Sequence, residues 1–499
     1  MKHNSLIRIK RGLGCTGVIA LLLFIAPGCN KWAGVPAPAN SINTDNVYTT
    51  DNTATAVLTG IYARMSTSDG NFTSPGGGAD MTDLPLSVIP GLSGDELSLF
   101  DTGNTLVSYY TNTLTGSTVN AQNTFWAASY NIIFICNSAL EGLSASKQLT
   151  PAVKQQLLGE AHFLRAFNYF YLVNLYGDVP LILSTDYKTN LSLARTSKEL
   201  VYAQIISDLK EAQSLLSANY LDATLTKTTS ARVRPTKWAA TALLSRTYLY
   251  TKDYADAEIQ ATAIINNSSQ FSLAALNDVF LANSSEAIWQ LQPVGNDIYS
   301  NTGEGFLFIL PPDGPGYLNP VYLSDSQVNS FEPGDLRKDD WTASMSANGT
   351  TYYYPFKYKI GAVAAPTQEY MMVLRLGEQY LVRAEAEAQQ GKLVAAINDL
   401  NVLRTRARGP NAGDLPALSA SLTQQQLLDA VAHERQVELF TELGHRWFDL
   451  KRTGRIDAVM STVAPQKGTT WDTNWQLYPI PTDEIGKDPH LVQNPGYLN

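Results

Sequence analysis

A long stretch of helical periodicity covers residues 150–182. Apolar residues recur there at intervals of three and four, which places them on one face of a helix. These residues are Leu157, Leu158, Ala161, Leu164, Phe167, Tyr171 and Leu175. Pro151, after an N-cap at Thr150, fits the first helical position, and Gly177 fits the end. Such a helix is not stable alone in water, so the pattern predicts helical partners.

Further segments with helical spacing predict a mostly helical protein. They cover residues 53–65, 125–143, 196–218, 236–266, 369–408 and 424–455. Thr196 with Glu199, and Thr423 with Gln426, fit capping boxes at two of the helix starts. Residues 236–266 and 369–408 each fit two helices joined by a tight turn, and Gly391 marks the second turn. Recurring helix pairs of this kind indicate tetratricopeptide-like repeats.

Long segments without helical periodicity separate these helices. Residues 66–118 are rich in Gly, Ser, Asp and Pro, and residues 303–320 are expected to form a loop. Residues 287–293 and 352–360 carry the alternation and aromatic content of short strands. Loops as long as the first of these are uncommon in a compact domain unless they have a function.

The N-terminus predicts export and a lipid anchor. Lys2 and Arg8 precede an apolar run over residues 18–26, and Cys29 follows Gly28. This order fits a signal peptide over residues 1–28, because the apolar run is too short to span a bilayer. We expect cleavage before Cys29, lipidation of its thiol, and a tether over residues 29–44. No linker interrupts residues 45–499, which we expect to form one body.

The composition argues against nucleic acid as a partner. The net charge is −9, only 16% of residues are charged, and the chain contains 25 Tyr and 8 Trp. Nucleic-acid binding requires basic patches, whereas this balance suits an extracellular surface for neutral ligands. After loss of the signal peptide and lipidation of Cys29, Cys136 is the remaining cysteine, and its apolar surroundings predict burial. We therefore expect no disulfide, no metal site and no cofactor.

One group of carboxylates requires a choice between catalysis and structure. Glu434, Glu438 and Glu442 recur every four residues, and a glycosidase needs a pair of carboxylates. They share the predicted helix 424–455 with arginines, and carboxylates on a helix surface commonly form ion pairs within that helix. We therefore expect a protein that is not an enzyme. A helical hydrolase that uses Glu438 and Glu442 remains the alternative.

Several segments resemble one family. The sequence LLGEAHFLRAFNYFYLVNLYGDVPLI, over residues 157–182, resembles the signature helix of the SusD/RagB family, surface nutrient-binding lipoproteins of Bacteroidetes-type bacteria. Residues 92–98, 236–266, 330–341, 369–408, 424–455, 477–485 and 493–497 also resemble segments of that family. The resemblance implies a predominantly α fold, with tetratricopeptide-like helix pairs as scaffold, long loop-rich insertions and a few short β-strands.

The resemblance also implies a function and partners. A member of this family captures a glycan at the exterior of the outer membrane and delivers it to a SusC-like TonB-dependent transporter. The RagB branch implies a peptide ligand instead, and the sequence leaves this alternative open.

The resemblance places the ligand in the loops, at about residues 66–118 and 290–345. Aromatic rings there can stack on sugar C–H faces, and polar side chains can hold hydroxyl groups. The candidates are Phe72, Asp80, Asp83, Phe100, Tyr109, Tyr110, Asn296, Asp297, Tyr299, Tyr317 and Tyr322. Trp289 and Trp341, in a strand-like run and after a turn motif, are expected to be packing residues instead.

Overall fold

The computed structural model describes residues 46–66, 86–101, 103, 105–121, 125–294 and 300–498. Tyr48–Asn499 form one compact unit, and Met1–Val47 are a separate one. The predicted signal peptide, the tether and Cys29 lie outside the described residues. Within the ranges described, no helix is both long and apolar enough to span a bilayer.

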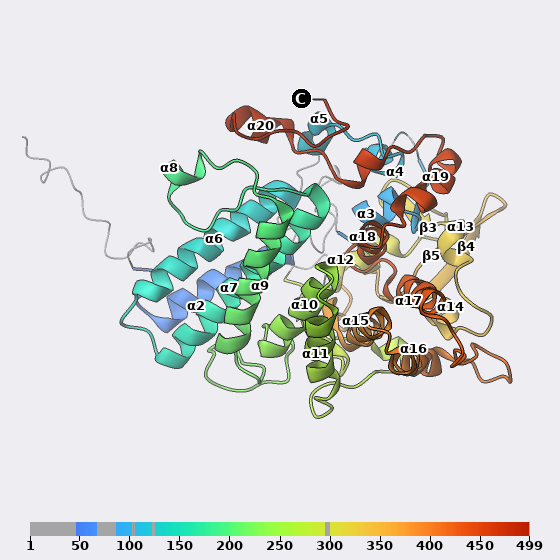
Figure 1. Cartoon of the computed structure of the whole chain (residues 1–499), viewed down its shortest axis with the longest axis horizontal. Helices are drawn as coiled ribbons and strands as arrows, with labels where there is room; N and C mark the ends of the chain where they lie inside the picture. Colours follow the sequence, from blue (N-terminus) through green and yellow to red (C-terminus); the bar gives the residue numbers. More distant parts are fainter. Residues whose placement is uncertain are drawn as a thin grey trace, which may run out of the picture. The chain divides into compact units, whose positions relative to one another are not determined.

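Long helices packed side by side form the scaffold of the Tyr48–Asn499 unit (Figure 1). Neighbours in the series contact one another, from α6 and α7 through α9, α10 and α11 to α15, α16 and α17. The scaffold helices are α2 (Asp51–Met65), α6 (Phe125–Ala145), α7 (Pro151–Tyr176), α9 (Lys198–Leu215), α10 (Lys237–Tyr250), α11 (Tyr254–Ile265), α15 (Leu376–Gln389), α16 (Leu393–Ala407) and α17 (Gln424–Leu439). The predicted predominantly α fold is therefore confirmed.

Shorter elements fill the insertions between these helices. The short helices are α3 (Ile89–Ser93), α4 (Val107–Tyr110), α5 (Gly116–Ala121), α8 (Tyr187–Asn190), α12 (Gly303–Phe308), α13 (Asp325–Val328), α14 (Leu336–Trp341), α18 (His445–Arg452), α19 (Ile456–Gln466) and α20 (Thr482–Lys487), with 3₁₀ turns η2 (Leu276–Asp278) and η3 (Thr473–Gln476). The strands are β1 (Leu97–Leu99), β2 (Ala287–Leu291), β3 (Val321–Leu323), β4 (Thr342–Ala347), β5 (Thr350–Pro355) and β6 (Met371–Arg375). They pair antiparallel as β1 with β3, β2 with β6, and β4 with β5.

Helix α7 lies at the centre of the N-terminal helices. It begins at Pro151 and ends at Gly177, whose φ of 74° is one that glycine adopts without strain. Burial extends around most of the helix rather than along one face, because α6 and α9 both pack against it. Arg165 in the middle of α7 donates from Nε to Asp208 of α9 at 2.8 Å and from Nη2 at 2.6 Å. The buried polar groups of α7 therefore fix its position against its neighbours.

The two predicted capping boxes have different outcomes. The box at Thr423 and Gln426 is present at the start of α17. The box at Thr196 and Glu199 is wrong, because α9 begins two residues after Thr196 without a side-chain cap. The backbone N–H and carbonyl of Thr196 instead form hydrogen bonds with those of Val179, so both groups are satisfied before the helix starts.

Two other segments differ from the sequence expectation. Residues 303–308, expected as loop, form α12, whose N-cap Thr302 accepts a hydrogen bond from the Gly305 N–H at 3.1 Å. The single helix expected over residues 424–455 is broken between α17 and α18. Thr441, Leu443 and Gly444 have φ values of 53°, 46° and 76° there, and left-handed backbone cannot continue an α-helix.

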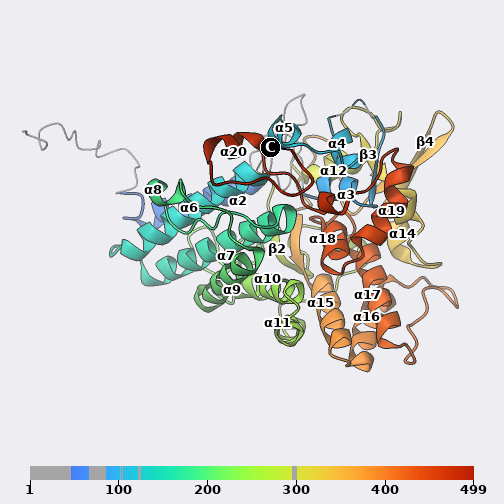
Figure 2. The same ribbon diagram turned by 45° about the horizontal axis from the view of Figure 1, so that its top comes forward.

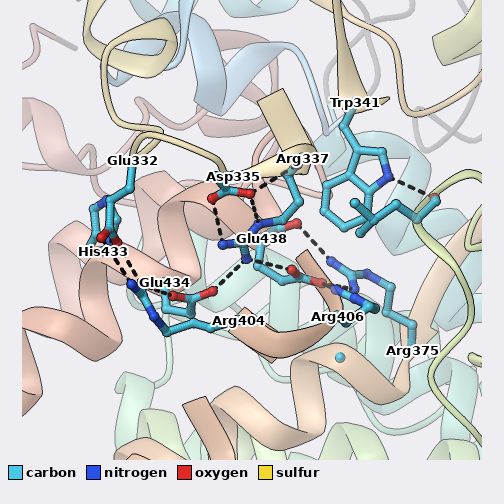
Figure 3. A network of polar contacts seen from close by, with 12 residues as sticks. Glu332, Asp335, Arg337, Trp341, Arg375, Arg404, Arg406, His433, Glu434 and Glu438 are labelled. Atoms are coloured by element: carbon cyan, nitrogen blue, oxygen red, sulfur yellow. Dashed lines mark hydrogen bonds and ion pairs between the residues drawn. The ribbon is translucent and has the colours of Figure 1, made fainter. Parts of the chain in front are cut away.

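The break leads into a buried network of ion pairs, shown in Figure 3. Glu438 on α17 accepts from Arg375 Nη1 at 2.6 Å, from Arg337 Nη1 at 2.9 Å and from Arg406. Its side chain is completely buried. The expectation that Glu434, Glu438 and Glu442 form surface pairs within one helix is therefore wrong, because their partners come from other elements.

The network joins segments that are far apart in sequence. Its cations are Arg337 on α14, Lys357 after β5, Arg375 on β6, and Arg404 and Arg406 on α16; its carboxylates are Glu286, Glu332, Asp335, Glu434, Glu438 and Glu442. The indole of Trp341 lies beside it and donates to the Leu276 carbonyl at 2.9 Å. Because a buried charge is tolerated only with partners, each of these segments must be in place for the others to be stable.

Removal of the Glu438 charge tests this role. We expect Glu438→Gln to reduce the free energy of unfolding by about 3–5 kcal/mol, because three arginines would lose a buried partner. Equilibrium denaturation in urea measures this change. As a control, Glu258→Gln breaks the partly exposed pair with Lys392, whose side chain is 47% exposed, and should change stability by less than about 1 kcal/mol. Equal effects of both substitutions would contradict the structural role of the network.

Candidate functional site

Two short strands bring distant loop residues together. Strand β1 pairs with β3 in the register Leu97 to Leu323, Ser98 to Tyr322 and Leu99 to Val321. The apolar members of both strands are buried. Since side chains alternate along a strand, Ser98 and Tyr322 lie together on the opposite, more exposed face. The Phe100 N–H donates to the Pro320 carbonyl at 2.8 Å and extends this pairing by one residue.

A cluster of four aromatic rings forms on that face. We call Phe100, Tyr110, Tyr322 and Tyr352 the aromatic platform. The Tyr352 ring on β5 lies 5.9 Å from the Phe100 ring and 5.1 Å from the Tyr322 ring, edge to face in both cases. Phe100 is 46% exposed, and Tyr110, Tyr322 and Tyr352 are partly buried. The platform therefore presents fixed ring surfaces to solvent with little conformational freedom to lose.

A tight hairpin positions Tyr352. Asn348 and Gly349 connect β4 to β5 with φ values of 51° and 79°, the combination of a two-residue type I′ turn. The alternation of β5 then places Tyr352 toward the platform and Tyr353, which is 37% exposed, on the opposite face.

Hydroxyl and amine groups border the rings. Burial raises the pKa values of Tyr110 and Tyr322, and a side-chain hydrogen bond between each phenol and Ser98 opposes this rise. Their phenols are therefore neutral at physiological pH and can donate and accept hydrogen bonds. The Lys467 amine lies 4.8 Å from the centre of the Tyr110 ring and donates to the Leu92 carbonyl at 2.6 Å. Burial lowers the Lys467 pKa to about 7.

The structure sorts the predicted ligand residues into three groups. Phe100, Tyr110 and Tyr322 come together in the platform, and Tyr317 lies 60% exposed on the loop before β3. Tyr109 is only 2% exposed and packs edge-on against Tyr478, so the expectation that it contacts ligand needs correction: it belongs to the core. Outside the described residues lie Phe72, Asp80, Asp83, Asn296, Asp297 and Tyr299.

Tyr352 is a platform residue outside the predicted ligand set. The sequence predicts a strand at this segment, but nothing local in the sequence shows that β5 lies beside the β1 and β3 pair. The alternation of Tyr352 and Tyr353 was the available signal, because one of two adjacent tyrosines on a strand must face away from the core.

The carboxylates considered for catalysis have structural roles. Both oxygens of Glu438 and both oxygens of Glu442 accept from cationic side chains, and these cations hold the pKa of each carboxyl below its usual value against the effect of burial. Both carboxyls are buried, paired and held in the ionised form, so this arrangement does not prepare either of them to act as a general acid. Trp289 and Trp341 are fully buried, which confirms that they are packing residues. In the part of the chain that the structure describes, no three His, Cys, Asp or Glu side chains form a group that could hold a metal ion.

The chemistry of the platform suits the binding of a ligand. Its exposed ring surfaces can stack on a flat apolar ligand face, and its phenol and serine hydroxyls can bond to polar groups at the ligand edge.

Two family models match the chain. One, described as "Starch-binding associating with outer membrane", matches residues 96–249. The other, described as "SusD family", matches residues 327–497. Together these ranges contain β1, β5, α7 and the carboxylates of α17.

Relatives and solved structures agree with these models. SusD-like protein P2 from Formosa agariphila is 26% identical over an alignment 521 positions long, gaps included, which covers 96% of this chain and 98% of the relative. A SusD superfamily protein from Bacteroides vulgatus superposes with a TM-score of 0.73 at 20% identity, over 90% of this chain and 99% of that one. A structure titled "Laminarin binding SusD-like protein" superposes with a TM-score of 0.70 at 22% identity, over 89% and 99%.

Two buried carboxyls support the strands of the platform. Glu96 directly precedes β1, and Glu304 lies on α12, which contacts β3. Burial raises the pKa of each to about 8. Glu304 accepts one long hydrogen bond from the Ser87 hydroxyl at 3.4 Å, while its Oε2 has no hydrogen-bond partner among the residues described. Glu304 is therefore more stable in this position as the neutral acid.

This burial predicts a pH dependence of stability. A carboxyl whose pKa is raised on folding stabilises the folded state below its unfolded pKa of 4.5 and loses this contribution as the pH rises through about 8. Glu304→Gln removes the titration. The variant should match the natural protein at pH 5 and exceed its free energy of unfolding by about 1–3 kcal/mol at pH 9. Urea denaturation at several pH values measures this difference.

A second carboxyl gives a control of opposite sign. Arg404 lowers the pKa of Glu332, so Glu332→Gln should be less stable than the natural protein at pH 7, and the difference should disappear in acid. A stability difference for Glu304→Gln that does not change with pH would contradict the assignment.

Proposed function

Because this chain belongs to the SusD/RagB family, we propose that it is a glycan-binding protein of the outer membrane that makes and breaks no covalent bond. The observation that carries the proposal is the aromatic platform. The rings of Phe100, Tyr322 and Tyr352 are held by edge-to-face contacts and by the β1–β3 pairing, so they lose little entropy when a sugar stacks on them.

The chemistry of the platform favours a neutral glycan. Phe100 offers the most exposed ring for stacking against sugar C–H groups. Tyr110, Tyr322 and Ser98 supply neutral hydroxyls that can replace the hydrogen bonds sugar hydroxyls make with water. The solved structure whose title describes laminarin binding and the starch-binding family model are consistent with this ligand class.

The remaining sequence candidates complete the proposed site. Tyr317 is exposed on the loop before β3 and is retained as a ligand contact. Phe72, Asp80, Asp83, Asn296, Asp297 and Tyr299 also stay as predicted contacts, since the loops that carry them lie outside the described residues. Within the single body over residues 45–499, the helices hold the loops at about residues 66–118 and 290–345.

The same proposal includes an anchor and a partner. The signal peptide over residues 1–28 and a lipid on Cys29 would attach the protein to the outer membrane, facing the exterior. A SusC-like TonB-dependent transporter would then receive the glycan. Affinity purification of the full chain from native membranes tests both parts, through the mass of the lipidated N-terminal peptide and the recovery of a transporter-sized barrel protein.

Substitution of adjacent tyrosines tests the platform. We expect Phe100→Ala and Tyr352→Ala each to weaken glycan binding roughly tenfold, because each loses ring area that contacts sugar. Tyr353→Ala is the matched control: it removes a similar ring from the opposite face of the same strand and should change affinity by less than about twofold. Affinity electrophoresis against a panel of soluble polysaccharides that includes laminarin and starch gives the comparison.

Two results would overturn the proposal. The platform is not the binding site if Tyr353→Ala weakens binding as much as Tyr352→Ala does. The glycan assignment fails if no polysaccharide binds while peptides bind to the same protein in calorimetry, as expected for the RagB branch.

A further inference from the structure

A pocket lies among the scaffold helices, away from the aromatic platform. Its volume is about 590 Å³, within the range of small-molecule sites. The end of α10, together with α15, α17, α18 and α19, supplies its walls, and Figure 2 shows these helices near one another. None of the four residues of the aromatic platform contributes to it.

Arg435 of α17 lines this pocket and lacks partners at its outer end. The side chain is 1% exposed, and its Nε donates to Asp449 at 2.6 Å. Nη1 and Nη2 are both buried and have no hydrogen-bond partner among the residues described. Burial of two guanidinium nitrogens without hydrogen-bond partners costs desolvation free energy, and hydrogen bonds to a bound acceptor would offset this cost.

A second donor of the pocket is also unsatisfied. The Tyr250 hydroxyl at the end of α10 is buried and has no partner within the described ranges. The Arg452 guanidinium lies 5.1 Å from the centre of the Tyr250 ring and holds it in place. Both Tyr250 and Arg435 line the same pocket; the unmatched Arg435 nitrogens can only donate, and the Tyr250 hydroxyl can donate as well as accept.

The carboxylates beside Arg435 and Arg452 are already in use. Asp449 accepts from Arg435 and from Arg452 Nε at 2.8 Å, and Glu385 accepts from Arg452 through both oxygens, at 2.5 and 2.6 Å. An additional cation would find no free carboxylate in these pairs, whereas an anion would find the free end of Arg435. Because Arg435 Nη1 and Nη2 can only donate, they favour a ligand that carries hydrogen-bond acceptors.

We propose that this pocket binds a small carboxylate ligand, with Arg435 Nη1 and Nη2 donating to its two oxygens and the Tyr250 hydroxyl donating to one of them. Guanidinium and carboxylate groups match in shape, and a bidentate pair is stronger and more directional than contact with a spherical ion. The site is separate from the aromatic platform and does not depend on the proposed glycan function.

Calorimetry and thermal unfolding of the full chain test this site. The probes are acetate, glucuronate and glutamate at constant ionic strength, with chloride as the reference anion. We expect at least one carboxylate to bind at one site per chain and to raise Tm above its value in chloride. Glucuronate and glutamate distinguish a sugar acid from an amino acid as the source of the carboxylate.

Three variants assign the binding to its residues. Arg435→Gln should weaken carboxylate binding at least tenfold, and Tyr250→Phe should weaken it severalfold, since it removes only a hydroxyl without a partner and leaves packing intact. Arg455→Gln is the control: Arg455 is a cation at the same pocket, but it is 35% exposed and paired with Asp429, so affinity should change less than twofold.

Several results would overturn the proposal. Equal Tm values in carboxylate and in chloride would indicate that water satisfies these donors. Equal weakening of carboxylate binding by Arg455→Gln and Arg435→Gln would indicate nonspecific attraction by positive charge. If Arg435→Gln does not fold, Tyr250→Phe takes its place. An unchanged carboxylate affinity in Tyr250→Phe would then overturn the proposal. Tyr352→Ala should leave carboxylate binding unchanged, so a failure here is distinguishable from a failure of the glycan proposal.

Discussion

The pairing of buried charges around Glu438 is the constraint on which the rest of the structure depends. Three arginines from α14, β6 and α16 meet this one carboxylate, and it is shielded completely from water. A buried charge that loses its partner is strongly unfavourable, so the network admits only the arrangement in which all these elements are present together. It thereby fixes the C-terminal helices against β6 and, through Lys357, against the end of the β4–β5 hairpin.

This constraint joins three of the widely spaced segments that resemble the family. Residues 330–341 contribute Glu332, Asp335 and Arg337, residues 369–408 contribute three more arginines, and residues 424–455 contribute Glu434, Glu438 and Glu442. In the sequence these segments are separate motifs with unrelated local patterns, whereas in the structure they are parts of one interaction. The platform, in contrast, combines Tyr322 of β3 and Tyr352 of β5 with Phe100, just after β1, and Tyr110 of α4.

Local patterns in the sequence predict most of the long helices, whereas contacts between distant segments cannot be predicted from them. The ends of α7 and the capping box of α17 depend on adjacent residues and were predicted. The break after α17 was not, because its left-handed residues, Thr441 and Leu443, are types that rarely adopt that conformation. For the candidate site, Phe100, Tyr110 and Tyr322 were chosen as loop aromatics. Tyr109 was misjudged because neighbours on a short helix face different ways, and Tyr352 was missed because strand pairing is non-local.

The order in which the chain is synthesised gives the β1–β3 pairing a further consequence. Strand β1 is made early, but its partner β3 and the Tyr352 ring follow only after α11 and β2. The residues that lock this region, from Arg375 to Glu442, emerge later still. Chains are made from the N-terminus, and long-range pairing forms slowly. The aromatic platform therefore needs segments from much of the chain, and a polypeptide that ends before Tyr352 lacks one of its rings.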